Sequence, residues 1–188
     1  MRKIFKYSWV IIINIIFILY LLELLTTIFL QPKVSKYVDI DYNRYQKARE
    51  LGIVFNDNFE KGYLNMVVNH GNLFLTSGHV SKIKGKLGDD LNIDQGYIAA
   101  KECAIWILQS LHQKVGSLNN IKVLKLFGMV NSTLDFTEQH LVINGASDLY
   151  HEIFGIDNHG YHARSAVGFA QLPTGVAVEI EAVFELIN

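Results

Sequence analysis

The residues best suited to chemistry lie near the end of the chain, in the stretch "HARSAVGFAQLPTGVAVEIEAVFEL" of residues 162–186. Alternate residues of a strand share a face, so Arg164 shares its face with Ala166, Gly168 and Ala170. Small side chains leave room beside the guanidinium, whose paired donors match the two oxygens of a carboxylate. The pattern therefore predicts a pocket for a small anion around Arg164.

The strand that follows, residues 176–186, has one apolar face and one acidic face. The apolar face carries Val176, Val178, Ile180, Ala182, Phe184 and Leu186, and the other carries Glu179, Glu181, Val183 and Glu185. The intervening Pro-Thr-Gly, residues 173–175, predicts that the two strands pair as a hairpin. A second interpretation of the arginine therefore stays open, in which exposed Arg164 bridges to Glu179 or Glu181 across the hairpin.

Other helices and strands must position these two strands, and the sequence predicts them from its apolar periodicity and its turn residues. Residues 40–52 predict a short amphipathic helix that ends at Gly52, and residues 64–78 predict a hairpin about His70-Gly71-Asn72. A polar loop over 79–93 precedes a helix that we expect Asp94 to cap and Gly116 to end. The apolar stripe of this helix is Ala100, Cys103, Ala104, Ile107, Leu108, Leu111 and Val115.

A strand over 121–130 and a helix from Asp135 or Thr137 to about Phe154 complete the pattern. The element order is then β-β-α-β-α-β-β, which predicts an α+β fold with two helices packed on one face of a mixed sheet.

The first thirty residues differ from the rest of the chain. Residues 9–30 are almost continuously apolar and about as long as a membrane-spanning helix. No small-residue cleavage pattern follows them, which favours an uncleaved anchor over a signal peptide. We therefore expect a membrane anchor over 1–36 and a globular domain over 37–188; a buried N-terminal helix is the alternative. The basic residues before the apolar stretch favour a domain on the outer, periplasmic side, with a cytoplasmic domain as the alternative.

Charge and composition exclude some classes of function. Residues 1–36 carry a net charge of +4 and the remainder −5, which gives −1 for the whole chain. An acidic domain is a poor partner for nucleic acid, so we expect none. The single cysteine, Cys103, excludes an internal disulfide. His159 and His162 have no further ligands at zinc spacing, so no metal is predicted.

Three stretches of the sequence are similar to one known family. "TSGHV", "NGASDLYHEIFG" and residues 162–186 resemble the Rid/YjgF family of reactive-intermediate imine and enamine deaminases, formerly called L-PSP endoribonucleases. The likeness runs from about residue 50 to the end and points to a less-studied branch. It implies a chorismate-mutase-like fold of the bacterial type. It also implies a homotrimer around a central barrel, with ligand clefts at the subunit interfaces.

The resemblance also implies roles for individual residues. Arg164 would bind the substrate carboxylate, and Glu179 would hold or activate a water molecule. The cleft would be lined by Gly78 after Ser77, by Asn144 and, on a looser alignment, by Tyr63. Ala166 stands where many members have a cysteine, which leaves the range of substrates open.

The chemistry implied is the hydrolysis of a small 2-imino or enamine acid to a 2-oxo acid and ammonia, without metal or organic cofactor. It needs a pinned substrate and an oriented water, roles that suit Arg164 and Glu179. A non-catalytic module that binds or senses small carboxylates at the membrane is the alternative. Ribonuclease activity, the older family label, is disfavoured by the acidic domain.

Overall fold

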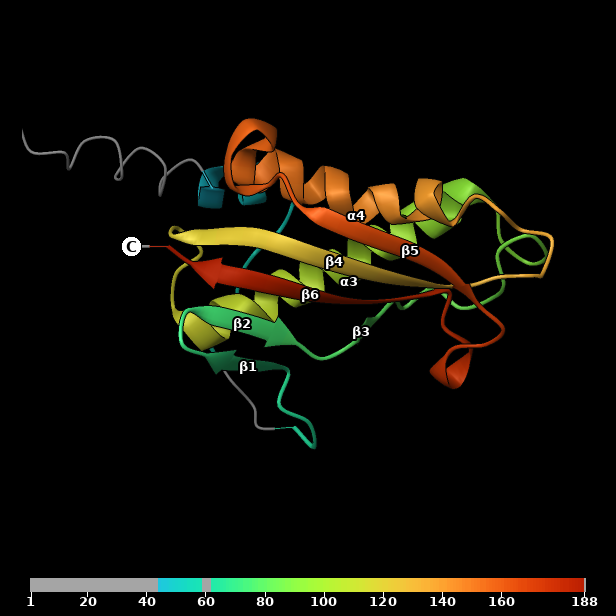
Figure 1. The fold of residues 1–188 in the computed structure, drawn as a ribbon, viewed down its shortest axis with the longest axis horizontal. Coiled ribbons are helices and arrows are strands. Elements are labelled where there is room, and N and C mark those ends of the chain that lie inside the picture. Colours follow the sequence, from blue (N-terminus) through green and yellow to red (C-terminus); the bar gives the residue numbers. More distant parts are fainter. Residues whose placement is uncertain (1–43, 59–61, 188) are drawn as a thin grey trace, which may run out of the picture. The chain divides into compact units, whose positions relative to one another are not determined.

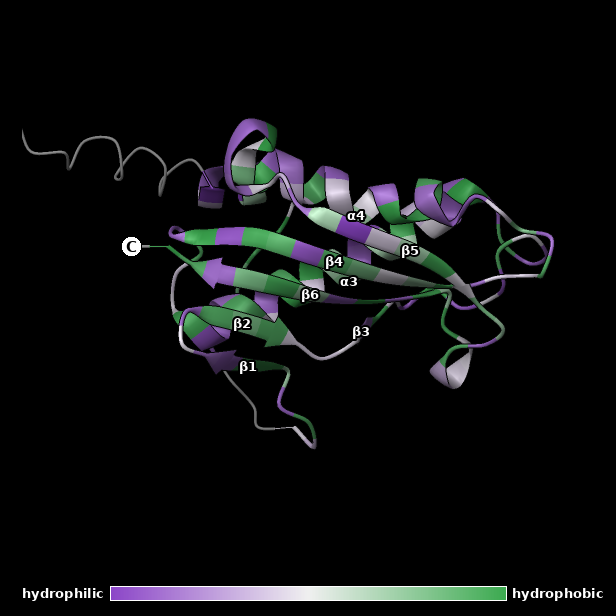
Figure 2. Ribbon diagram, viewed as in Figure 1, coloured by the Kyte–Doolittle hydropathy of each residue, from purple (hydrophilic) through white to green (hydrophobic). Residues whose placement is uncertain are grey.

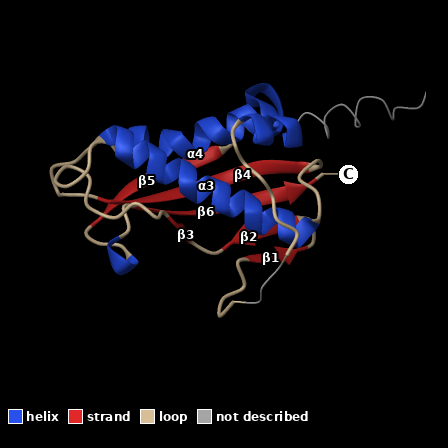
Figure 3. Ribbon diagram, turned by 180° about the vertical axis from the view of Figure 1, so that it is seen from behind, coloured by secondary structure: helices blue, strands red, loops and turns tan. Residues whose placement is uncertain are grey.

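The computed structural model describes residues 44–58 and 62–187, which fold around one six-stranded sheet. Figure 1 shows the sheet with the two long helices α3 and α4 crossing behind it, and Figure 3 shows the same helices in front when the molecule is turned by 180°. Both helices therefore cover one face of the sheet, as the sequence predicts.

The strands are joined in an order that differs from their order along the chain. They are β1 (Val67–His70), β2 (Leu73–Thr76), β3 (His79–Val80), β4 (Ile121–Asn131), β5 (Ala163–Phe169) and β6 (Val178–Leu186). The sheet order is β1-β2-β6-β4-β5, with β3 also paired to β6. Only β4 and β5 run parallel, joined through α4, so the sheet is mixed.

The hairpin predicted around Pro-Thr-Gly does not form. β4 lies between β5 and β6, and it pairs with β5 on one side and with β6 on the other. Residues 170–177 connect β5 to β6 across the end of β4 instead of folding them together. Arg164 of β5 therefore has no cross-strand neighbour on β6, and the predicted bridge to Glu179 or Glu181 is ruled out.

The first hairpin and the first long helix are confirmed, with one correction. β1 and β2 pair antiparallel about Gly71, whose φ of +57° suits the turn. α3 (Ile93–Val115) ends at Gly116 as predicted, but its N-cap is Asn92 and not Asp94. Asn92 forms a capping box with Gln95, in which each side chain bonds to the other's backbone N–H. Asp94 lies in the first turn, where its charge suits the helix dipole.

The second long helix begins later than predicted. α4 (Gln139–Phe154) has Glu138 at its N-cap, with no side-chain capping bond, so neither Asp135 nor Thr137 caps it. Leu134 and Asp135 instead form a turn, which is closed by a hydrogen bond from the N–H of Phe136 to the carbonyl of Thr133.

The core lies between the two helices and the sheet face they cover. The face of β6 with Val178, Ile180, Ala182 and Phe184 is buried, whereas Glu179 and Glu181 on the other face are not. The stripe of α3 predicted from Ala100 to Leu111 is also fully buried. Figure 2 shows hydrophobic and hydrophilic segments alternating along the strands and helices. Strand alternation in the sequence is thus a sound guide to the buried face.

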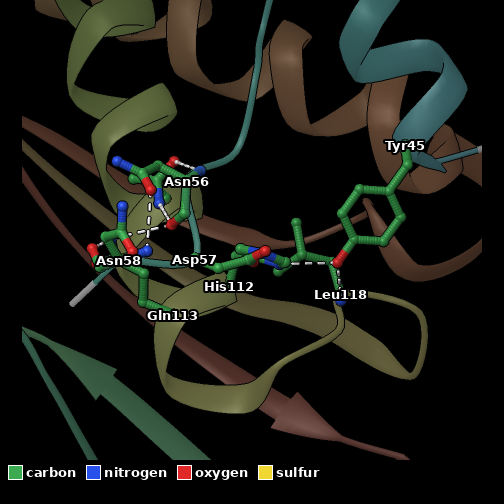
Figure 4. A network of polar contacts seen from close by, with 8 residues as sticks. Tyr45, Asn56, Asp57, Asn58, His112, Gln113 and Leu118 are labelled. Carbon is green, nitrogen blue, oxygen red and sulfur yellow. Dashed lines mark hydrogen bonds and ion pairs between the residues drawn. The ribbon is translucent and has the colours of Figure 1, made fainter.

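Helical residues 44–50 and the segment 53–58 are attached to α3 by polar contacts (Figure 4). The N–H of Leu118 donates to the Tyr45 hydroxyl at 2.9 Å. The carboxylate of Asp57 accepts from Nε2 of His112 at 2.8 Å, so Nδ1 of a neutral His112 ring accepts from the Tyr45 hydroxyl, at 2.9 Å. Buried Arg44 donates to the carbonyls of Leu118, Asn119 and Ile121.

The prediction of a membrane-anchored protein has to be corrected. Within residues 44–58 and 62–187, no helix is long and apolar enough to cross a membrane. The anchor predicted over 9–30 lies outside the described residues. The transmembrane helix, the bilayer as a partner and the periplasmic placement are therefore withdrawn.

Candidate functional site

Arg164 is held against α4 by one end of its guanidinium. Its Nη1 donates to Oδ1 of Asn144 at 2.8 Å and to Oγ of Ser147 at 3.1 Å. Asn144 and Ser147 are three residues apart on α4, so they lie on the same face of that helix. The structure thus brings together two residues that the family resemblance had named, Arg164 and Asn144.

The other edge of the same guanidinium carries no hydrogen bond within the described residues. Both hydrogens of Nη1 are used by Asn144 and Ser147, whereas Nε and Nη2 are left with three N–H groups. Arg164 is partly buried, and this burial lowers the pKa of its guanidinium while the charge of Asp148 opposes the shift. The Nε–Nη2 edge has the spacing that a carboxylate accepts bidentately.

Glu179 lies against the backbone of Gly78. A Cβ atom at position 78 would stand 1.9 Å from Oε1 of Glu179 and 2.9 Å from its Cδ, so only glycine leaves room for this carboxylate. Partial burial raises the pKa of Glu179, and the neighbouring charge of Glu181 raises it further. A carboxyl group with a raised pKa binds a proton more readily than an ordinary glutamate, which suits a group that takes up and returns a proton.

Ser77 and Tyr63 belong to the same end of the sheet as Glu179, and their roles differ. The hydroxyl of Ser77 donates to the carbonyl of Asn65 at 2.9 Å and its N–H donates to the carbonyl of Met66. Ser77 thereby fixes the segment that leads into β1. Tyr63 lies two residues before Asn65 and is fully exposed, so its ring is not packed within the subunit.

Arg164 and Glu179 do not meet within one subunit. Arg164 pairs with Leu126 of β4, which pairs with Ala182 of β6, and both partners are buried beneath the helices. Glu179 pairs with Met129. Since Glu179 and Ala182 are an odd number of residues apart on the same strand, their side chains lie on opposite faces of the sheet. The predicted site residues therefore form two groups on opposite faces of the sheet, Arg164 with Asn144 and Glu179 with Gly78.

The small residues that follow Arg164 on its face differ in their surroundings. Ala166 is partly buried against the hydrophobic core, whereas Gly168 and Ala170 are exposed. A Cβ atom on Gly168 would lie 2.7 Å from Oγ of Ser132 and 2.9 Å from Nε2 of Gln139, so these side chains occupy the space beside that glycine. These contacts do not involve Arg164, and the pocket for a small anion beside it stays a prediction.

A hollow lies beside β3, next to Gly78. It has a volume of about 420 Å³ and is lined by Met66, Gly78, His79, Val80, Ser81, Lys82, Trp106 and Ser110. It borders Gly78 but contains neither Arg164 nor Glu179. Among the described residues, no three His, Cys, Asp or Glu side chains are grouped so that they could hold a metal ion.

Sequence reasoning missed Ser147, which bonds to Arg164, and His162, which bonds to Ser147. Nε2 of His162 lies 3.1 Å from Oγ of Ser147, and its Nδ1 lies 2.5 Å from the carbonyl of Gly160. Two spacings could have indicated them: Ser147 is three residues from Asn144 on a helix, and His162 is two residues from Arg164 in an extended segment.

Comparison with known proteins identifies the family. Residues 57–185 match the sequence family described as Endoribonuclease L-PSP, which is the Rid/YjgF family. The chain belongs to this family. The match includes β1–β5, all of β6 but its last residue, both long helices and every predicted site residue, and it confirms the resemblance seen in the sequence.

Individual relatives of this Rid/YjgF chain are found among curated proteins and solved structures. Protein TCP17 of Trypanosoma cruzi is 48% identical over 105 residues, which span 55% of this chain and 65% of that protein. A protein of unknown function from Agrobacterium tumefaciens is 34% identical, with a TM-score of 0.71, over 80% of this chain and 98% of that one. A putative endoribonuclease from Shewanella oneidensis has a TM-score of 0.70 at 24% identity, over 77% of this chain and 99% of that one, which shows a common fold.

Membership of the Rid/YjgF family gives the function at a coarse level. It supports a role as a small-molecule deaminase or a related role. Members of the family typically form homotrimers and bind small molecules. The mixed sheet with two helices on one face is consistent with the chorismate-mutase-like fold of these proteins.

Proposed function

We propose that this protein hydrolyses small 2-imino acids to 2-oxo acids and ammonia. The observation that carries the proposal is the hydrogen bonding of the Arg164 guanidinium. Its Nη1 is anchored by Asn144 and Ser147 while its Nε–Nη2 edge has no partner within the described residues. A guanidinium fixed at one end and open at the other is pre-organised for a carboxylate.

Glu179 would handle the proton in this reaction. A carboxylate form of Glu179 takes a proton from water as the water oxygen bonds to the imine carbon. The same proton then passes to the imine nitrogen, which gives a carbinolamine with one hydroxyl and one amino group on the same carbon. Glu179 next takes the hydroxyl proton and delivers it to the amino nitrogen, so that the C–N bond breaks and ammonia leaves as the carbonyl forms. One water molecule is consumed, and no electron donor or acceptor is needed. The raised pKa of Glu179 supports both proton transfers.

The two groups would meet across the interface of a homotrimer. Among the described strands β5 is an edge strand that pairs with β4 alone, so its outer edge would be available to a neighbouring subunit. The Arg164 group of one subunit would then face the Glu179 and Gly78 group of the next, with Ser77 and exposed Tyr63 at the same cleft. Ala166 would lie beside the arginine in place of the family's cysteine, and imine hydrolysis needs no covalent nucleophile.

A protein that only binds small carboxylates is the second candidate. The open edge of Arg164 would be sufficient for binding by itself, because it requires nothing from Glu179. Ribonuclease activity fits less well, since the chain outside residues 1–36 carries a net charge of −5.

One experiment tests the proposal and separates it from the binding-only candidate. The purified full-length chain is mixed with 2-iminopropanoate generated in place by an amino-acid oxidase, and release of the 2-oxo acid is followed against a protein-free reaction. We expect acceleration by the wild type and none by Arg164→Lys or Glu179→Gln. In calorimetric titration with 2-oxobutanoate, the affinity of Arg164→Lys should be about ten- to a hundredfold weaker than that of the wild type. The affinity of Glu179→Gln should be largely retained. Wild-type binding without acceleration would instead support the binding-only candidate.

A further inference from the structure

Besides its bond to Asn144, Arg164 begins a series of hydrogen bonds that runs through Ser147 and His162 and ends at the backbone carbonyl of Gly160. Arg164 Nη1 bonds to Oγ of Ser147 at 3.1 Å, and Oγ lies 3.1 Å from Nε2 of His162. Nδ1 of His162 lies 2.5 Å from the carbonyl oxygen of Gly160. Ser147 is buried in α4, and both Arg164 and His162 are partly buried.

The direction of each hydrogen bond in this chain follows from the groups at its two ends. The carbonyl of Gly160 can only accept, so Nδ1 of His162 carries the hydrogen. In a neutral imidazole Nε2 is then an acceptor, and the hydroxyl of Ser147 donates to it. The hydroxyl oxygen accepts from Arg164, which has no lone pair to offer. Every group in the chain is satisfied when His162 is neutral.

Protonation of His162 would reverse one of these bonds. Nε2 would become a donor, so the hydroxyl hydrogen of Ser147 would have to turn away. A second positive charge would also stand beside Arg164. The groups that face His162 already favour its neutral form: burial lowers the pKa of its imidazole most, and His151 and Arg164 lower it further, against the hydrogen bond to Gly160.

Two aromatic rings of α4 lie next to the His162 ring. The His151 ring of α4 lies 5.3 Å from that of His162, and the buried Tyr150 ring meets it edge-on at 6.0 Å. Asp148 of α4 acts on Arg164 and accepts a hydrogen bond from the Tyr97 hydroxyl at 2.9 Å. No carboxylate is within hydrogen-bond distance of His162 among the described residues, so the hydrogen bond to Gly160 is opposed by burial and by two neighbouring positive groups without help from a negative charge.

We propose that Ser147 and His162 are positioning residues, which hold Nη1 of Arg164 so that its Nε–Nη2 edge is presented to a carboxylate only while His162 is neutral. This inference rests on the proposed function and deepens it, since it concerns how the same arginine is oriented. It makes carboxylate affinity depend on pH through a residue that does not touch the ligand.

The test measures affinity for 2-oxobutanoate by calorimetry from pH 8 down to about pH 5, in the full-length chain. Wild-type affinity should fall about three- to tenfold, the range of one hydrogen bond, as the pH drops below the ordinary histidine pKa of about 6.5. His162→Phe and Ser147→Ala should show the weakened affinity at every pH. His162→Gln keeps an acceptor for the serine but does not titrate, so its affinity should stay near the high-pH value throughout.

Control measurements separate this role from a merely structural one. His70→Gln removes an exposed histidine at the end of β1 and should leave the wild-type pH profile unchanged. Deaminase assays of Ser147→Ala should show a raised KM with kcat nearly kept, because Glu179 is untouched. Thermal melts of each variant identify any that fails to fold, and His162→Gln then decides the question by its flat profile.

Two failures can be told apart. If the wild type binds no carboxylate at any pH, the proposed function fails and this inference fails with it. If the wild type binds but Ser147→Ala and His162→Phe bind equally well with the same pH profile, only the positioning role is overturned.

Discussion

Arg164 and Glu179 lie on opposite faces of the same β-sheet. Arg164 stands in register with buried Leu126 beneath the helices, and Glu179 stands in register with Met129 on the face that the helices do not cover. A reaction that needs both side chains therefore needs two subunits, each of which contributes one of them.

The first prediction concerns such shared sites. Arg164→Lys and Glu179→Gln should each be inactive alone, but subunits of the two variants that are mixed, unfolded and refolded together should regain activity. In a random mixed trimer, about a quarter of the interfaces combine an intact arginine with an intact glutamate, so about a quarter of wild-type activity is expected. Sedimentation should show a trimer in every case. A mixture that stays inactive while assembling as trimers would argue against a shared site.

The second prediction concerns the contact between Gly78 and Glu179. Gly78→Ala places a Cβ atom 1.9 Å from the Glu179 carboxylate, so the glutamate side chain must swing away. The deaminase rate should fall about tenfold or more, because a proton-transfer group would be misplaced. The melting temperature should change little, since the displaced atoms belong to the flexible end of a side chain.

Gly62→Ala is the matched control for this substitution. Its new Cβ atom would lie 3.8 Å from the carbonyl oxygen of Leu64, an ordinary contact. We expect wild-type activity from it, and a Gly78→Ala protein as active as Gly62→Ala would remove Glu179 from the mechanism.

The third prediction concerns the pKa of Glu179. Burial raises this pKa and the charge of Glu181 raises it further, so the active carboxylate form is reached only at a higher pH. Glu181→Gln removes the second cause, and the acid limb of the pH–rate profile should move to lower pH. Glu185→Gln makes the same change in net charge further along the same face of β6 and should leave that limb in place. Identical shifts in both variants would point to a general charge effect.

The fourth prediction concerns the contacts that hold residues 44–58 to α3 (Figure 4). Tyr45→Phe leaves the N–H of Leu118 and Nδ1 of His112 without their hydroxyl partner, which should reduce the free energy of unfolding by about 1–3 kcal/mol. Asp57→Ala should change it by no more than about 0.5 kcal/mol, because the side chain of Asp57 is 94% exposed. Chemical denaturation of both variants measures the difference, and equal losses would contradict this ranking of the contacts.

The sequence by itself determined the features that depend on near neighbours along the chain. Alternation in residues 176–186 identified the buried face of β6, and the apolar stripe from Ala100 to Leu111 identified the buried face of α3. The turn at Gly71 and the helix end at Gly116 also follow from local backbone geometry. The motif around Arg164 was long enough to identify the family.

Only the tertiary structure decided which strands are neighbours. Pro-Thr-Gly at 173–175 looks like a hairpin turn, yet β4 enters between β5 and β6 and pairs with both. Strand order is set by which arrangement buries the apolar faces and pairs the backbone groups of the whole sheet, and the residues of one turn do not encode that choice. The insertion of β4 separates Arg164 from the acidic face of β6 and gives it Asn144 and Ser147 as partners. The chemical types of the site residues could therefore be predicted from the sequence. Their division between two faces of the sheet could not, because it depends on contacts between residues far apart in the chain.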